Sequence, residues 1–478
     1  MKFIDASPTP FHMCAEASKM LLAAGFVELS ETDEWRPLLK PGGRYFFVRG
    51  GSLVAFFVGG GFVAGNGFNI VGAHTDSPVL KLKPCSKKSA HGCIQINVET
   101  YGGGLWHTWF DRELSLAGSV IVREADGAYV KKLIHVARPL LRIPNLCIHL
   151  TAAEDRGRFA PNKETHLQPI LGLINEAVNK PAAAAAEAGM EERHAPELLG
   201  VLAAECACEV SAIMDFEMTL CDTQPSQVWG LSNELLSAPR LDNQISCYTA
   251  LRALLAHAAG APAHAPDVCM VAMFDHEEVG SDSTTGAGGP VMTESMQRVS
   301  SCFAADEPHE AAERLLVSTR KSFLMSADTA HAVHPNYAEK HQSAHAPKLN
   351  AGTVIKTNDN QRYATDGESG FVVRELARMA GISVQEFMVK NDCPCGSTIG
   401  PIISTRTGLR TVDLGVACWS MHSIRETIGV GDVENSYVLF HTFFSSFAEL
   451  DKKCRFGQPK VCPPCGAKPT FQVWSPAK

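Results

Sequence analysis

Four apolar runs in this chain each end directly before residues whose side chains can bind a metal ion. The runs and the residues that follow them are 68–73 before His74, 267–274 before Asp275-His276-Glu277-Glu278, 323–327 before Asp328, and 416–421 before His422. Near-continuous apolar runs bounded by polar turns are typical of buried parallel strands. Because sites in open α/β sheets form beyond the carboxyl ends of such strands, we expect these polar residues at one edge of one sheet. The pattern predicts an α/β fold with a mixed, mostly parallel central sheet.

Helices with apolar residues at helical spacing are expected to flank this sheet, as in residues 243–258 and 367–380. Between about residues 89 and 234 the chain instead shows short alternating runs with glycine-rich turns, which indicates a mostly β insertion. We therefore predict a discontinuous catalytic domain of residues 1–88 and 235–451 around an inserted domain of residues 89–234.

The last part of the chain, residues 452–478, changes in composition to Pro, Cys, Lys and Gly. A metal knuckle built on Cys454, Cys462 and Cys465 is an alternative interpretation, but no fourth Cys or His ligand follows them. We therefore predict that this segment is a disordered tail.

The overall charge argues against nucleic acid as a partner. The chain has 43 basic and 51 acidic residues, a net charge of -8, and no long basic run that could neutralise a phosphate backbone. Residues 1–26 lack the continuous apolar core of a secretory signal, and the longest apolar stretch, residues 53–65, is too short to cross a bilayer. The 16 cysteines lack the regular spacing of a disulfide framework. We predict a cytoplasmic protein that associates with neither nucleic acid nor membrane.

Four candidate metal ligands each have an ordinary structural explanation when taken alone. His74 can be a satisfied core histidine, and His422 can be a turn residue. Asp242 and Asp328 can each cap a helix. Together with one glutamate at the same predicted edge, however, they form the set that two zinc-like ions require, with one bridging carboxylate and two further ligands for each ion.

The pair Glu277-Glu278 meets a second requirement of metal-assisted hydrolysis. Such chemistry needs one carboxylate that binds metal and an adjacent free carboxylate that takes a proton from the attacking water. The alternative is a pair of solvated surface glutamates. That alternative is weakened because the pair follows the apolar run 267–274.

Five ordered segments of this chain resemble the signature motifs of the aspartyl aminopeptidases. They are GAHTDSP (72–78), RLDN (240–243), DHEEVGS (275–281), SADTAHAVHPNY (326–337) and MHSIRE (421–426). Two further similar blocks, residues 101–118 and 391–401, extend the resemblance from about residue 5 to residue 450. On these motifs the chain is identified as a member of that family.

The resemblance implies two divalent metal ions per subunit, with zinc expected and manganese or cobalt as alternatives. Their ligands would be His74, Asp242, Glu278, Asp328 and His422. Asp242 would bridge the two ions, and Glu277 would be the general base. Asp76 would lie behind His74 and orient its ring, a task that ligand histidines require.

The resemblance also implies roles for four residues outside this cluster. His149 matches a histidine of the inserted domain that reaches the active site of a neighbouring subunit and stabilises the transition state, whereas its sequence context alone favours a core residue. Lys356 would contact the acidic side chain of the substrate, with Tyr363 and His331 in the same pocket. Its sequence context alone favours an edge-strand lysine that points to solvent. A net charge of -8 repels acidic substrates at long range, so acidic preference needs such a local cation.

The function implied by the resemblance is the removal of Asp and Glu residues from peptide N-termini. The implied assembly is a homo-oligomer, a tetrahedral particle of twelve subunits in which the inserted domain mediates oligomerisation. A broader aminopeptidase or an acyl-amino-acid hydrolase of similar fold is the main alternative. A catalytically inactive scaffold would be expected to lack a ligand or the base, and all six of these residues are present.

Overall fold

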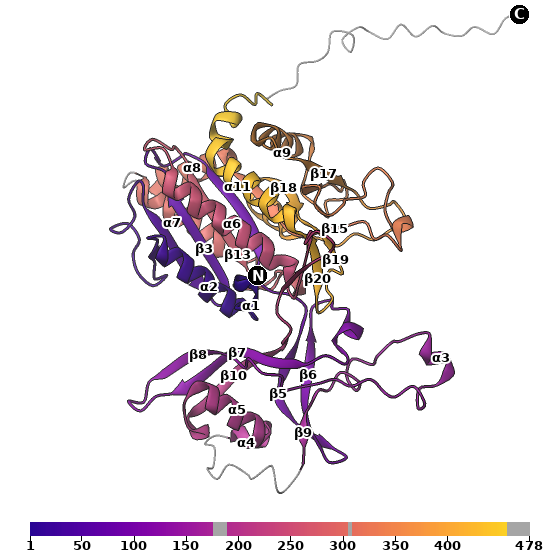
Figure 1. The fold of residues 1–478 in the computed structure, drawn as a ribbon. Coiled ribbons are helices and arrows are strands. Elements are labelled where there is room, and N and C mark those ends of the chain that lie inside the picture. Colours follow the sequence, from indigo (N-terminus) through magenta and orange to yellow (C-terminus); the bar gives the residue numbers. More distant parts are fainter. Residues whose placement is uncertain (175–188, 305–307, 457–478) are drawn as a thin grey trace, which may run out of the picture.

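The computed structural model describes residues 1–174, 189–304 and 308–456, and contains a helix-covered sheet and a β-rich region below it (Figure 1). The predicted disordered tail at residues 452–478 lies outside the described residues from position 457 onward. Within the described ranges, no helix has both the length and the apolar composition that a membrane crossing requires.

The central sheet of the described chain has nine strands in the order β1-β2-β3-β13-β4-β14-β18-β16-β17. Their bounds are Val27–Glu28 (β1), Arg44–Arg49 (β2), Ser52–Val58 (β3), Val268–Phe274 (β13), Phe68–His74 (β4), Phe323–Ala327 (β14), Arg410–Gly415 (β18), Thr353–Lys356 (β16) and Val384–Phe387 (β17). The central strands β13, β4, β14 and β18 run parallel. The strands that flank this group, β3 and β16, are antiparallel to their neighbours β13 and β18. The predicted mixed, mostly parallel sheet is confirmed.

Strand β13 is apolar along its whole length because helices cover both faces of the sheet. Its odd-numbered residues 269–273 face one core, and its even-numbered residues 268–274 face the other. The first core includes α1 (Lys2–Asp5), α2 (Pro10–Ala23), α6 (Leu241–Gly260), α9 (Gly367–Ala380) and α11 (Val430–Asp451). The second includes α7 (Val291–Phe303), α8 (Pro308–Lys321) and α10 (Ile399–Thr407). The helices predicted at residues 243–258 and 367–380 correspond to α6 and α9.

One of the four predicted strands lies in another sheet. The run 416–421 is predicted to belong to the central sheet, but its strand is β19 (Ala417–Trp419) in a five-stranded sheet. Within the described residues that sheet has the order β11-β12-β20-β19-β15, with bounds Gln227–Trp229 (β11), Leu235–Ala238 (β12), Glu426–Gly429 (β20) and Ala330–His331 (β15). The chain leaves the central sheet at Gly415, where an added Cβ would lie 1.6 Å from the Asp328 carbonyl oxygen. The expectation of four strands in one sheet is therefore wrong for this run.

The β-rich region is built, in its described residues, on a six-stranded antiparallel sheet in the order β8-β7-β10-β5-β6-β9. The bounds are Tyr129–His135 (β8), Leu114–Arg123 (β7), Ile213–Asp222 (β10), Val79–Ala90 (β5), Cys93–Tyr101 (β6) and Ile170–Leu173 (β9). Helices α4 (Met190–Arg193) and α5 (Pro196–Cys206) contribute to its separate core. Strand β5 begins at Val79, so the predicted boundary between residues 88 and 89 falls within a strand of this sheet. The division into a catalytic and an oligomerisation domain stays a prediction.

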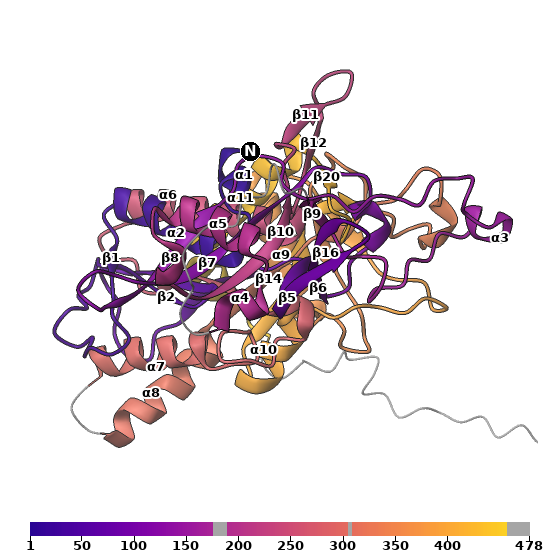
Figure 2. The ribbon, with the colours of Figure 1, turned by 90° about the horizontal axis from the view of Figure 1, so that it is seen from below.

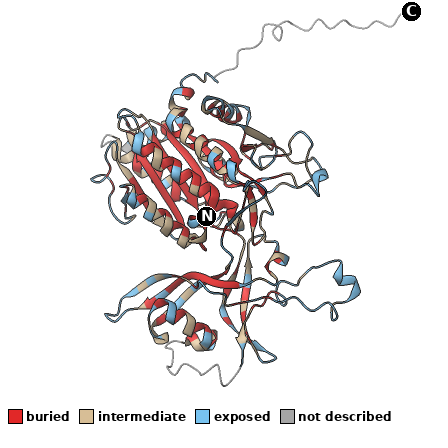
Figure 3. Cartoon of the chain, viewed as in Figure 1, coloured by how far each residue is buried: buried red, intermediate tan, exposed pale blue. Residues whose placement is uncertain are grey.

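A long arm, residues 144–166 with the short helix α3 (Ala153–Arg156), extends away from this sheet (Figure 1, Figure 2). Most of its residues are exposed (Figure 3). Its exposed side chains include the apolar residues Leu146, Ile148 and Leu150. The α3 arm therefore adds little to the cores of its own chain.

Candidate active site

Residues that follow three neighbouring parallel strands of the central sheet meet at one edge. His74 ends β4, the pair Glu277-Glu278 lies in a 3-10 turn after β13, and Asp328 follows β14. Strand β4 lies between β13 and β14, and all three run in the same direction. The prediction that these residues share a sheet edge is confirmed.

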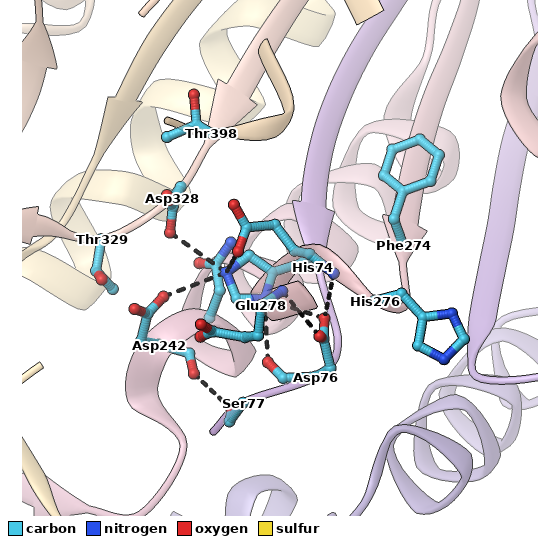
Figure 4. A network of polar contacts seen from close by, with 12 residues as sticks. His74, Asp76, Ser77, Asp242, Phe274, His276, Glu278, Asp328, Thr329 and Thr398 are labelled. Atoms are coloured by element: carbon cyan, nitrogen blue, oxygen red, sulfur yellow. Dashed lines mark hydrogen bonds and ion pairs between the residues drawn. The ribbon is translucent and has the colours of Figure 1, made fainter. Parts of the chain in front are cut away.

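Asp242, at the start of α6, connects the two histidines of the cluster. Its Oδ1 lies 3.3 Å from Nε2 of His74, and its Oδ2 lies 3.4 Å from Nε2 of His422, which follows β19. Asp328 Oδ1 is 3.4 Å from the same nitrogen of His74 (Figure 4). Glu278 Oε1 is 3.3 Å from the same nitrogen of His422. The structure thus brings all five predicted ligands together, with Asp242 at the centre.

Two groups of three potential metal donors share Asp242. The first donor group is His74, Asp242 and Asp328, and the second donor group is Asp242, Glu278 and His422; within each, the donor atoms lie within 4.8 Å of one another. A further grouping joins His74 to the glutamate pair. Glu277 belongs to neither of the two groups that share Asp242.

The donor groups fit divalent cations. Asp242 Oδ1, Glu278 Oε1 and Asp328 Oδ1 are buried, and each faces a histidine nitrogen at 3.3 or 3.4 Å without making a hydrogen bond to any described residue. Burying a carboxylate oxygen without a hydrogen bond or counter-ion is costly, and a cation removes that cost. Imidazole nitrogens and carboxylate oxygens are also ligand types that zinc takes in proteins.

The crowding of carboxylates shows in the ionisation of the cluster. Burial raises the pKa of Glu277 to about 7, and neighbouring carboxylates act in the same direction. Burial and the negative charge of Asp242 raise the pKa of Glu278 well above its usual value. Burial alone would lower the pKa of His422, but Asp242 and Glu278 raise it to about 10. The cluster therefore has a deficit of positive charge, which a bound cation would supply.

Asp76 supports several of these residues at once. Nδ1 of His74 donates to the main-chain carbonyl of Asp76 at 3.0 Å, and the Asp76 carboxylate is 3.5 Å from the same nitrogen. The carboxylate also accepts the backbone N–H groups of Glu277 and Glu278, each at 3.1 Å. Its fourth partner is the hydroxyl of Tyr101, at the end of β6, which donates at 2.7 Å. The sequence gives no sign of this contact, because a tyrosine at a strand end resembles any half-buried aromatic residue.

Lys356 is buried beside the first donor group. It ends β16, which lies between β17 and β18, so the interpretation as an edge-strand lysine pointing to solvent is wrong. The residue is 1% exposed, and Nζ lies 3.3 Å from Asp328 Oδ2 and donates to the Thr329 carbonyl at 3.1 Å. The ammonium is also 5.1 Å from the ring centre of Tyr363. Lys356 and Tyr363 are therefore neighbours, as a common pocket requires.

His331 lies on β15, in the smaller sheet, with its ring centre 5.1 Å from that of Phe387. The residue is exposed at the surface, but desolvation by the surrounding protein, together with the charge of nearby Lys356, lowers the pKa of its imidazole to about 4. A neutral ring is the result at physiological pH.

His149 lies apart from the other predicted site residues. It is exposed on the α3 arm, so the interpretation as a core residue is wrong. Figure 1 shows that this arm projects outward from the β-rich region, and His149 is in none of the groups of potential metal donors among the described residues. Within its own chain His149 does not join the site, and its role in a neighbouring subunit stays a prediction.

A sheet edge that gathers histidines and carboxylates around a shared aspartate defines an α/β metalloenzyme. The chain belongs to the aminopeptidase I zinc metalloprotease (M18) family, whose model matches residues 3–444. The family resemblance predicted from the five motifs is confirmed.

Known proteins are similar to this chain over nearly its full length. A probable aspartyl aminopeptidase of Ricinus communis is 45% identical, over 95% of this chain and 96% of the relative. Among solved structures, a cryo-EM structure of the Ape4 and Nbr1 complex superposes with a TM-score of 0.90 at 42% identity, covering 95% of this chain and 86% of that chain. The mApe1 dodecamer of Saccharomyces cerevisiae superposes with a TM-score of 0.83 at 29% identity, covering 96% of this chain and 98% of that chain.

Proposed function

We propose that this chain hydrolyses the peptide bond after an N-terminal Asp or Glu residue, using two divalent cations per subunit, with zinc preferred and manganese or cobalt as alternatives. The observation that carries the proposal is Asp242, which presents one carboxylate oxygen to each of the two histidines. The name of the Ricinus relative, a probable aspartyl aminopeptidase, supports the acidic preference.

The proposed hydrolysis follows from the division of the cluster into two donor groups and one further carboxylate, Glu277. The first and second donor groups would each hold one cation, and when bound the cations supply Lewis acidity to the scissile carbonyl and to the attacking water. Glu277 belongs to neither group, and burial brings its pKa to about 7, close to the value that suits a general base near neutral pH. It takes the proton of the water and passes it to the leaving amine. Asp76 accepts the backbone N–H of Glu277 and so keeps this base in position.

Acidic preference would come from Lys356. A lysine ammonium has three N–H donors, and two of them are directed at Asp328 and at the Thr329 carbonyl. The third can bind the carboxylate of a substrate side chain that enters the pocket next to Tyr363 and His331. Because the lysine is buried, water competes weakly for this donor, and an uncharged substrate would leave it unpaired.

We also propose that the chain forms a homo-oligomer in the cytoplasm, a tetrahedral dodecamer in which residues 89–234 mediate assembly. The support is the mApe1 relative, which is a dodecamer, and the α3 arm with its exposed apolar residues. In such a particle His149 would act in the active site of a neighbouring subunit and stabilise the transition state.

The test is a substrate panel combined with metal analysis. Purified full-length chain is assayed on peptides that begin with Asp, Glu, Ala or Leu and on acylated amino acids, while its zinc content is measured. The proposal predicts two metal ions per subunit and a clear preference for Asp and Glu. A preference for Leu would indicate a broader aminopeptidase, and turnover confined to acylated amino acids would indicate an acyl-amino-acid hydrolase.

A further inference from the structure

Glu426 is a buried carboxylate that has no part in the proposed chemistry. It begins β20 and is 2% exposed. Its Oε2 accepts the backbone N–H of Asp242 at 2.7 Å, and its Oε1 accepts the backbone N–H of His422 at 2.8 Å. The Glu426 side chain therefore binds the backbone of two members of the second donor group, Asp242 and His422. These two residues are 180 positions apart in the chain.

The surrounding strands hold Glu426 in place. Strand β20 pairs with β12, where Glu426 lies opposite Ala238, and with β19, which leads to His422. Strand β12 in turn leads to Asp242. Strands β12, β20 and β19 are thus neighbours in the same five-stranded sheet. The Glu426 carboxylate therefore has a fixed position relative to Asp242 and His422, which follow β12 and β19.

Asp76 shows the same arrangement with another pair of site residues. Its carboxylate accepts the backbone N–H groups of Glu277 and Glu278. The two carboxylates therefore bind the main chain of different pairs of site residues. The pair held by Glu426 lies entirely within the second donor group, whereas His74 and Asp328 of the first donor group donate no hydrogen bond to it.

We propose that Glu426 is a positioning residue for the second donor group, which keeps Asp242 and His422 at the separation needed to bind a cation. This inference rests on the proposed function with its two cations per subunit. The effect of losing Glu426 should be uneven. The cation at the second donor group should be weakened most, because both N–H anchors of Glu426 lie in that group, whereas only the shared Asp242 connects Glu426 to the first.

A merely structural role is the competing explanation, and the chain offers a matched control for it. Asp432 is also a buried carboxylate, 1% exposed, and it also accepts two backbone N–H groups, from Asn350 at 2.7 Å and from Gly352 at 2.9 Å. Neither partner belongs to a donor group. Asp432→Asn therefore reproduces the loss of such a bridge away from the metal donors.

The experiment compares Glu426→Gln with Asp432→Asn and the wild type in the full-length chain. The Gln side chain keeps the shape of Glu but has one acceptor oxygen and one NH2 group, so it can accept only one of the two N–H groups. Each metal-free protein is titrated with Zn²⁺ by calorimetry and with Co²⁺ by visible absorption, and the melting temperature of each metal-free protein is recorded. If Glu426→Gln does not fold, Glu426→Asp takes its place, because it keeps the charge but is one methylene too short to reach both groups.

We expect Glu426→Gln to bind one of its two cations about 10- to 100-fold more weakly than the wild type, with a changed cobalt absorption spectrum. Asp432→Asn should bind both cations like the wild type, even if its melting temperature falls. Equal metal binding by Glu426→Gln and the wild type would overturn the inference, and so would equal weakening in both variants. A wild-type chain that binds a single cation would instead reject the proposed function.

Discussion

The centre of the two donor groups and the α3 arm differ sharply in their exposure to solvent. His74 and Asp242 are 2% and 3% exposed, whereas Leu146, Ile148 and Leu150 on the arm are 63%, 61% and 72% exposed. The donor groups are assembled by segments from the whole length of one chain. Their buried carboxylate oxygens lack hydrogen bonds to any described residue, and a bound cation would compensate for their burial. The arm presents apolar side chains that its own chain does not cover. Exposed apolar residues gathered on one projecting segment are typical of an interface with another protein.

This difference separates what one subunit can do from what an assembly can do. One chain contains both donor groups and Glu277. His149 belongs to neither donor group, and its proposed role requires a second copy of the chain.

The largest loss is expected from Glu277→Gln, because the amide cannot take the proton of the attacking water. Turnover should fall by about 100- to 10,000-fold, the usual contribution of a general base, while metal content stays unchanged. Steady-state kinetics and metal analysis measure the two effects. Glu278→Gln is the comparison, and it should lose metal instead. Near wild-type turnover of Glu277→Gln with its metal retained would contradict the assigned roles.

His149→Phe tests the proposed contribution of the α3 arm to the active site of a neighbouring subunit. Loss of one donor to the transition state should lower kcat by about 100- to 1000-fold, with the particle intact by light scattering. His309→Phe changes an exposed histidine on α8 and should leave kcat unchanged. Mixing His149→Phe subunits with Glu277→Gln subunits should then restore part of the activity. Hybrid particles of verified composition that stay inactive would show that His149 does not act across a subunit boundary.

Lys356→Met should separate acidic from uncharged substrates. Removal of a buried lysine that pairs with a carboxylate is expected to lower kcat/KM for N-terminal Asp or Glu by about 30- to 1000-fold. Uncharged substrates should lose much less, although the lost contact with Asp328 will lower their turnover to some extent. The ratio of kcat/KM for Glu and Ala peptides measures the effect. An equal loss on both would assign Lys356 a structural role.

Tyr101→Phe should have the smallest effect, because it removes one hydrogen bond to Asp76 and leaves the other contacts of Asp76 in place. A net hydrogen-bond contribution of about 0.5–1.5 kcal/mol corresponds to a decrease in kcat of about 2- to 12-fold, with little change in KM. Tyr45→Phe is the matched control, since it removes a hydroxyl that donates to the Leu38 carbonyl. If both variants retained full kcat, Tyr101 would have no positioning role.

The burial of the apolar runs could be predicted from the sequence, but the strands that would lie beside them could not. Continuous apolar runs indicate strands covered on both faces, and three of the four runs are such strands of the central sheet. The fourth run, 416–421, has the same apolar character but belongs to the smaller sheet. Composition does not specify which strand is the neighbour, because any buried strand needs apolar residues.

The supporting residues were the hardest to predict, for the same physical reason. Glu426 and Tyr101 lie in strands and look like ordinary polar residues near turns. Their contacts with Asp242 and Asp76 join segments that are far apart in the chain, and such pairings leave no local pattern. Lys356 shows the same limit, since its burial depends on the two strands on either side of β16.

The central claim is that Asp242 is shared by two cation sites. Its most direct test is a crystal structure of the full chain grown with zinc, with diffraction recorded on both sides of the zinc absorption edge. The account predicts two anomalous peaks per subunit, one contacted by His74 and Asp328, the other by Glu278 and His422. One carboxylate oxygen of Asp242 should contact each peak. A single peak, or two peaks that Asp242 does not join, would contradict the account.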